Sequence, residues 1–193
     1  MRVVARWRDL AGLGLEHCVL SEDDTGRVLE GVVVGNRLSP HGGRYCVRTD
    51  ADGRTREVRV SYVGGPRLHV DTDGRGRWRD RRTDAPLPAL EGCLDVDIGM
   101  TPATNMLPIR RLALAEGASA EILAAYVPLP AEVTGPFVPK PAPQRYTCLE
   151  QDRLYRYEGL FRGFSAELRV DAHGLVLDYP ETFQRVDLPS ASD

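Results

Sequence analysis

Apolar and polar residues alternate with a period of two in four separate stretches of this 193-residue chain. The stretches cover residues 44–49, 57–62, 67–71 and 167–171. Successive side chains of a strand point to opposite faces, so this pattern predicts antiparallel strands with one buried face. Asp-Gly pairs at 52–53 and 73–74 lie between stretches and suit hairpin turns that need a positive φ. The pattern predicts a mostly β fold: a meander, barrel or roll.

One short segment favours a helix. Thr101 can cap its start, and Pro102 suits the first helical position. Pro108 then predicts that the helix ends after about two turns, because proline interrupts a helix interior. Further along, residues 111–114 and 121–127 favour a hairpin, although the second stretch also contains good helix formers.

The composition is that of an ordinary globular protein, with 42% hydrophobic and 27% charged residues. Residues 128–143 are rich in proline and predict an extended connection. Too few strands follow this connection to build a stable second domain, so we expect one sheet to cross it. The expectation is one β domain over residues 1–187 and a disordered tail over residues 188–193.

The charge pattern argues against nucleic acid as a partner, because the net charge is −3. Residues 75–82 form one basic cluster, in which alternation predicts that Trp78 is buried and the arginines are solvated. No apolar run approaches the roughly 20 residues that span a membrane. Arg6 and Arg8 interrupt any apolar core of an export signal, which predicts a cytoplasmic protein starting at Met1.

The cysteines are too widely spaced for a common metal site or for a disulfide framework. They are Cys18, Cys46, Cys93 and Cys148, with no C-x-x-C pair among them. We expect four reduced thiols, mostly buried, because a cytoplasmic compartment is reducing. The sequence also has no phosphate-binding glycine loop, G-x-S-x-G or H-E-x-x-H motif, so neither a cofactor nor a metal is expected.

Asp95 and Asp97 flank Val96 and so share one face of a predicted strand. Their side chains would lie about 7 Å apart along the strand. Such a pair suits metal ligation or a pair of carboxyl groups with different pKa values. It equally suits a solvated or ion-paired strand face.

Arg110 and Arg111 are adjacent, and on a strand one of them would face inward. A buried arginine needs a partner, which Asp95, Asp97 or Glu16 can supply. This arginine either forms a structural ion pair or holds an anionic or sugar head group.

Glu16, His17 and Cys18 are the residue types of a general base and a nucleophile. Neighbours on a strand face apart, which is poor geometry for such a dyad. The other interpretation is a polar start to the first strand. No catalytic residue is therefore assigned.

The central residues 94–98 and 101–112 resemble the putative glycolipid-binding family of bacterial proteins, formerly a domain of unknown function. The resemblance covers nearly the whole chain and also rests on Trp7, residues 14–17, 74–78, 144–146 and 170–180, and Phe183. It implies a spiral β-roll: a long antiparallel sheet wrapped around one short α-helix, in a protein that forms homodimers.

The resemblance also implies a non-catalytic protein that holds an acyl chain or glycolipid. Its polar rim would consist of Glu16, His17, Asp95, Asp97, Asn105, Arg110 and Arg111. We further expect Asn105, one of the two arginines and the aspartate pair to form one polar cluster where the helix meets the sheet. The alternatives are a hydrolase or isomerase that uses the carboxylates and His17, or a structural dimer without a small ligand.

Overall fold

The structure is a computed structural model that describes residues 1–186, so the expected tail over 188–193 lies outside the described residues. Fourteen strands form one sheet. Their bounds are β1 (Arg2–Asp9), β2 (Leu15–Asp23), β3 (Gly26–Gly35), β4 (His41–Thr49), β5 (Thr55–Tyr62), β6 (Arg67–Thr72), β7 (Trp78–Asp80), β8 (Asp95–Ile98), β9 (Ser119–Val127), β10 (Lys140–Glu150), β11 (Leu154–Gly159), β12 (Phe164–Val170), β13 (Val176–Tyr179) and β14 (Phe183–Arg185).

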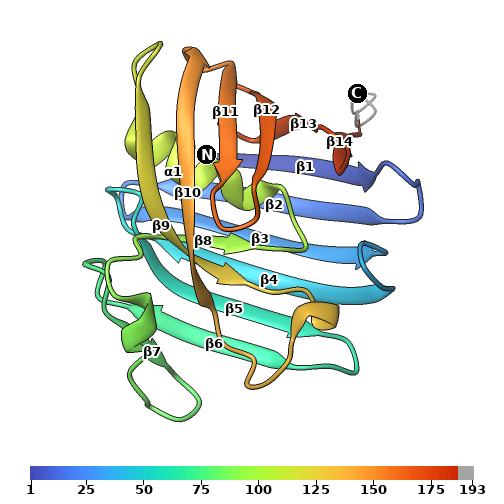
Figure 1. The fold of residues 1–193 in the computed structure, drawn as a ribbon, viewed down its shortest axis with the longest axis vertical. Helices are drawn as coiled ribbons and strands as arrows, with labels where there is room; N and C mark the ends of the chain where they lie inside the picture. The colour runs from blue at the N-terminus through green and yellow to red at the C-terminus, as the bar shows by residue number, and fades with distance from the viewer. Residues whose placement is uncertain (187–193) are drawn as a thin grey trace.

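The sheet consists of two halves that meet in its middle. Strands β1 to β7 form one half, β8 to β14 form the other, and β1 pairs with β14. Figure 1 shows β9 to β12 standing upright across β1 to β6, with the helix α1 (Met106–Leu112) held between the two halves. The sheet stays open, with β7 and β8 at its two edges. This confirms the predicted mostly β roll around one short helix.

The sheet differs from the expected one in a single pairing, because β8 runs parallel to β9. Antiparallel neighbours can be joined by a short turn, whereas parallel neighbours need a longer crossover. The crossover here is the helical segment between Ile98 and Ser119. One segment of the chain therefore provides both the buried helix and the crossover that the parallel pair needs.

A 3₁₀ turn begins near the expected helix start, whereas α1 itself begins at Met106 and ends later than expected. The Thr101 Oγ1 accepts a hydrogen bond from the backbone N–H of Ala103 at 2.9 Å, and a 3₁₀ turn over Ala103–Asn105 leads into α1. Pro108 falls in the first turn of α1, where a missing N–H costs no hydrogen bond. The predicted stop at Pro108 is therefore wrong, and α1 continues to Leu112.

The predicted hairpin over residues 111–114 and 121–127 is also wrong in its first arm. Residues 111 and 112 belong to α1, and only Ser119–Val127 forms a strand, β9. Ala113 ends the helix in the left-handed region, with φ of 44°. The alternation in this stretch was too short to distinguish a helix end from a strand.

The proline-rich stretch is continuous with the sheet. After a short 3₁₀ turn over Pro130–Glu132, the chain enters β10 at Lys140. Pro141 and Pro143 lie in β10 and pair with β9, before β10 gains β11 as its second neighbour at Gln144. A proline cannot donate to a ladder, and here one side of the strand needs no donor.

The core fills the inside of the roll. Trp7 and Trp78 are buried, and their indole N–H groups donate to the carbonyl oxygens of Val176 and Cys93 at 2.7 and 2.9 Å. The burial of Trp78 agrees with the alternation of its segment. The helix adds buried apolar side chains that include Met106. Since these side chains occupy the roll, the helix is part of the core.

All four cysteines carry free thiols. Cys18, Cys93 and Cys148 are buried, and Cys46 is half-buried. Burial raises the pKa of Cys18 to about 12 and that of Cys93 to about 11. Thiols in such surroundings are poor nucleophiles, so these two cysteines act as small apolar core residues.

Candidate ligand-binding cleft

A cleft of about 320 Å³ lies between the two halves of the roll, near the start of the helical segment. Six aromatic side chains line it: Tyr126, Tyr157, Phe161, Phe164, Tyr179 and Phe183. They come from β9, β11, the β11–β12 turn, β12, β13 and β14. The rolling of the sheet therefore assembles an aromatic site from residues that are far apart in the sequence.

The rings form two groups. Phe164 and Tyr179 are stacked with centroids 6.0 Å apart, and Tyr157 and Phe183 each meet Tyr179 edge-on with centroids 6.3 Å apart. Tyr126 and Phe161 form the second group, with centroids 5.8 Å apart. Rings held by such contacts have few alternative rotamers, so both groups present fixed apolar surfaces to the cleft.

Two arginines hold fixed positions beside the rings. The Arg162 guanidinium lies 4.6 Å from the Tyr126 centroid and pairs with Glu132 at 2.5 Å. Arg37 donates to the Gly99 carbonyl oxygen at 2.6 Å and lies 6.0 Å from the Phe183 centroid. Each guanidinium keeps further N–H groups that can donate to a ligand in the cleft.

Asp97 and Asn105 supply acceptors on the cleft wall. Asp97 Oδ2 accepts from Gln144 at 2.7 Å, and the Asn105 amide donates to the Tyr146 hydroxyl at 3.0 Å. Within residues 1–186, no hydrogen bond engages Oδ1 of either side chain. Burial raises the pKa of Asp97, with the Gln144 hydrogen bond acting in the opposite direction.

This lining combines flat apolar surfaces with separate donors and acceptors. Aromatic faces pack against the C–H groups of a ring, while carboxylate, amide and guanidinium groups bind its hydroxyl groups. Among residues 1–186, no group of three or more His, Cys, Asp or Glu side chains is placed to hold a metal ion. The cleft is chemically suited to a polar ring that carries hydroxyl groups.

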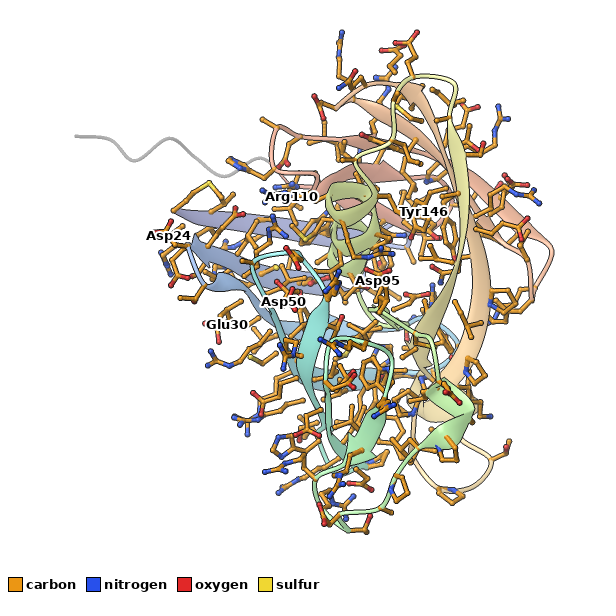
Figure 2. All side chains as sticks on the ribbon, turned by 90° about the vertical axis from the view of Figure 1, so that its left-hand side faces the viewer. Asp24, Glu30, Asp50, Asp95, Arg110 and Tyr146 are labelled. Carbon is orange, nitrogen blue, oxygen red and sulfur yellow. The ribbon has the colours of Figure 1, made fainter. Side chains whose placement is uncertain are left out.

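Asp95 and Asp97 have separate partners although they share a strand face. Asp95 is buried and binds Arg111 through both carboxylate oxygens, with a shortest distance of 2.6 Å. Burial raises the pKa of Asp95, and Arg111 only partly offsets this. Arg110 instead binds Glu22 through two hydrogen bonds of 2.9 Å. Figure 2 shows Asp95 and Arg110 near the helix, in the middle of the molecule.

The expected single polar cluster is therefore divided into three pairs: Asp95 with Arg111, Asp97 with Gln144, and Asn105 with Tyr146. The prediction that Asp95 can partner an inward arginine is confirmed. The expectation that the two arginines follow strand geometry is wrong, because both lie on α1. Consecutive helical residues diverge by about 100° and so reach different partners.

Glu16 and His17 lie on opposite faces of β2. Glu16 is buried behind the cleft, where it accepts hydrogen bonds from the Tyr45 hydroxyl at 2.5 Å and from Thr101 at 2.7 Å. Its Oε2 is buried without a hydrogen-bond partner, and burial raises the pKa of Glu16 to about 7. His17 lies on the outer face, where its Nδ1 accepts a hydrogen bond from Arg6 Nε at 3.2 Å.

Of the seven predicted rim residues, the cleft lining contains Asp97 and Asn105. Glu16 contributes indirectly by holding Thr101, which lines the cleft. Sequence reasoning missed the aromatic residues, because they are spread over residues 126–183 without a shared motif. The one local signal is Phe161-Arg162-Gly163-Phe164, in which two rings and an arginine flank a turn glycine.

Fold and cleft together define a class: an open β-roll around one helix, with an aromatic and polar cleft where the sheet halves meet. The chain belongs to the family described as "Putative glycolipid-binding", whose model matches residues 4–185. It is also similar to the crystal structure of a DUF1089 family protein from Pseudomonas aeruginosa. The two share 40% identity and a TM-score of 0.74, over 90% of this chain and 92% of the other. No curated protein matches the chain.

Proposed function

We propose that this protein binds the sugar head group of a glycolipid-like ligand in the cleft, without catalysis. The observation that carries this proposal is the convergence of six aromatic rings on the free acceptors of Asp97 and Asn105. The description of the family agrees with a ligand of this class. A volume of about 320 Å³ is at the small end of the range for ligand sites, which suits one or two sugar rings.

Within residues 1–186, the cavity that lies inward of the cleft is too small for an acyl chain. A second cavity next to the cleft, lined by residues such as Trp7 and Met100, measures only about 20 Å³. That volume corresponds to about one water molecule. We therefore propose that the head group alone enters the protein and that the acyl chain stays outside.

Replacing Asp97 with asparagine is expected to weaken binding of a soluble glycoside about tenfold or more, because a charged acceptor for hydroxyl groups is lost. Replacing Tyr179 with alanine should have a similar effect, since it removes a stacking surface. Isothermal titration with methyl and octyl glucosides and galactosides measures both effects. Asp24→Asn, in a turn at the far end of β2, is the matched control.

Equal affinities for the Asp97 and Asp24 variants would contradict the proposal. So would the absence of glycoside binding by the wild-type protein together with the absence of a co-purified lipid in native mass spectrometry. The cleft would then have no role in holding sugars.

A second candidate function is a hydrolase or isomerase acting on the same class of ligand. The raised pKa of Asp97 in a cleft is the one observation that favours it. His17, which this alternative also invokes, lies on the outer face of the sheet. Incubating the protein with the glycosides that it binds and measuring released sugar distinguishes binding from turnover.

We also propose that the protein forms a homodimer, as the family resemblance implies. Leu15 and Val34 are neighbours across β2 and β3 and are exposed on the outer face together with Val32. A patch of this kind is suited to a partner surface. Light scattering in solution should give twice the monomer mass, and a Val34→Asp variant should give the monomer mass.

A cytoplasmic location remains part of the proposal. Four free thiols support it, because paired cysteines are typical of oxidising compartments. Within residues 1–186, none of the helices is long and apolar enough to cross a membrane.

A further inference from the structure

The two rims of the rolled sheet carry turns of opposite character. Ten large hydrophobic side chains are exposed among the described residues. Four of them lie in turns of one rim, and Leu160 and Phe161 lie in the β11–β12 turn, whose Phe161 lines the cleft beside that rim. We call these six residues the apolar rim: Leu10, Leu13, Leu38, Val63, Leu160 and Phe161. They belong to the turns β1–β2, β3–β4, β5–β6 and β11–β12. In Figure 1 the first three of these turns lie on the right.

The opposite rim is polar. Its turns β2–β3, β4–β5 and β6–β7 contain Asp24, Asp50, Asp52 and Asp73. Met1 is its one exposed large hydrophobic residue within the described part of the chain. Asp24 and Asp50 are labelled in Figure 2, where the left-hand side of Figure 1 faces the viewer. The exposed apolar turns of the described residues therefore lie away from this polar rim.

The apolar rim is continuous with the cleft. Phe161 is part of the cleft lining, and Leu38 follows Arg37, which also lines it. The Leu10 backbone N–H donates to the carbonyl oxygen of Thr182, another lining residue, at 3.3 Å. The cleft and the apolar rim consequently lie on the same side of the molecule.

The exposed side chains of this rim are costly for a protein in water. Leu13 and Leu38 are 67% exposed and Val63 is 84% exposed. Leu38 also has φ of 65°, a left-handed conformation that is unfavourable for a non-glycine residue. Packing of the core does not explain why this turn holds a leucine outward.

Arginines accompany the apolar residues. Arg8 lies two positions before Leu10, Arg37 precedes Leu38 and Arg162 follows Phe161. Arg67 begins the strand after the turn that carries Val63. Apolar side chains with arginines beside them match a lipid surface, whose apolar layer lies beneath negatively charged phosphates.

We propose that the apolar rim docks on an anionic lipid surface and turns the cleft towards the head groups there. The identity of the ligand in the cleft rests on the proposed function, whereas the docking is inferred from the apolar rim alone. The leucines and Phe161 would enter the interfacial layer, and Arg8, Arg37 and Arg67 would lie at phosphate depth. A second copy of the chain fits this rim less well, because it would cover the mouth of the cleft.

Flotation with vesicles tests the docking. The wild-type protein should bind vesicles of phosphatidylcholine mixed with phosphatidylglycerol more strongly than vesicles of phosphatidylcholine alone, and added salt should weaken the binding. Leu13→Asp and Leu38→Asp should each reduce binding to the mixed vesicles about tenfold or more, since each removes a leucine that docking would bury in the lipid layer. Ala51→Asp adds the same charge to a turn of the opposite rim and should leave vesicle binding unchanged.

Soluble glycosides separate this proposal from the proposed function. The two leucine variants should bind methyl glucoside or galactoside as the wild-type protein does, and Asp97→Asn should still float with the vesicles. Vesicle binding without glycoside binding would support docking and refute the proposed function of the cleft. A wild-type protein that binds glycosides and ignores both kinds of vesicle would overturn the docking proposal. A dimer that Leu13→Asp or Leu38→Asp converts to monomer would also overturn it, because the rim would then be a subunit contact.

Discussion

Replacing Arg111 with methionine is expected to lower the free energy of unfolding by about 3–5 kcal/mol near neutral pH. The Asp95 side chain is only 1% exposed and the Arg111 side chain 15% exposed, so the substitution leaves a buried carboxylate without its partner. Burial already raises the pKa of Asp95 while Arg111 is present. Without Arg111 this pKa should rise further, and the loss of stability should shrink as the pH falls and Asp95 takes up a proton.

Urea denaturation at neutral and acidic pH measures the loss. Arg110→Met is the matched control, because Arg110 is the adjacent arginine and its pair with Glu22 is more exposed, at 27% and 21%. We expect that control to cost about 1 kcal/mol or less. Adding Asp95→Asn to Arg111→Met should restore much of the lost stability. A loss for Arg111→Met no greater than for Arg110→Met would show that the buried pair has no special weight.

Glu16 is expected to make the protein less stable as the pH rises. Its pKa is raised from 4.5 to about 7 in the folded state, mainly by burial, with hydrogen bonds from Tyr45 and Thr101 acting against the shift. The folded state therefore holds this proton more tightly than the unfolded state. The stabilisation is complete below the unfolded pKa of 4.5, decreases as the pH rises to about 7 and is absent above that. The difference amounts to about 3 kcal/mol.

Glu16→Gln removes the titrating group while keeping an acceptor for the two hydroxyl groups. We expect this variant to exceed the wild-type free energy of unfolding by up to about 3 kcal/mol at about pH 8, and to match it near pH 5. Chemical denaturation across this pH range is the measurement. Glu30→Gln, on the outer face of β3, removes an exposed carboxylate and should leave the pH dependence unchanged. Parallel curves for wild type and Glu16→Gln would refute the assignment of the titration to Glu16.

The sequence predicted the strands because their information is local. Alternation in residues 57–62 and the Asp-Gly turns report directly on which face of the sheet is buried. The same reasoning placed Trp78 in the core and identified Asp95 as a possible partner for a buried arginine. In both cases the prediction followed from the burial of one side chain, because burial restricts the kinds of groups that can lie next to it.

The cleft could not be predicted in this way. Tyr126 and Tyr179 become neighbours of one site only because the sheet rolls, and nothing in their local sequence records that curvature. Asp95 and Asp97 illustrate the same limit on a smaller scale. Alternation placed them on one face, but their separate partners come from α1 and from β10, which reach the strand from different directions.

The pairing of β1 with β14 also affects how the chain folds during synthesis. The first seven strands can pair with one another as they leave the ribosome, whereas the edge of β1 waits for the last strand, with Arg8 and Gln184 separated by 176 positions. Contacts between residues so far apart in the sequence form slowly, because closing the long loop between them costs conformational entropy before the contacts stabilise the fold. Phe183 lines the cleft and pairs with Asp9 across this junction. The cleft is thus completed only after synthesis has passed β14, so a nascent chain does not yet present it.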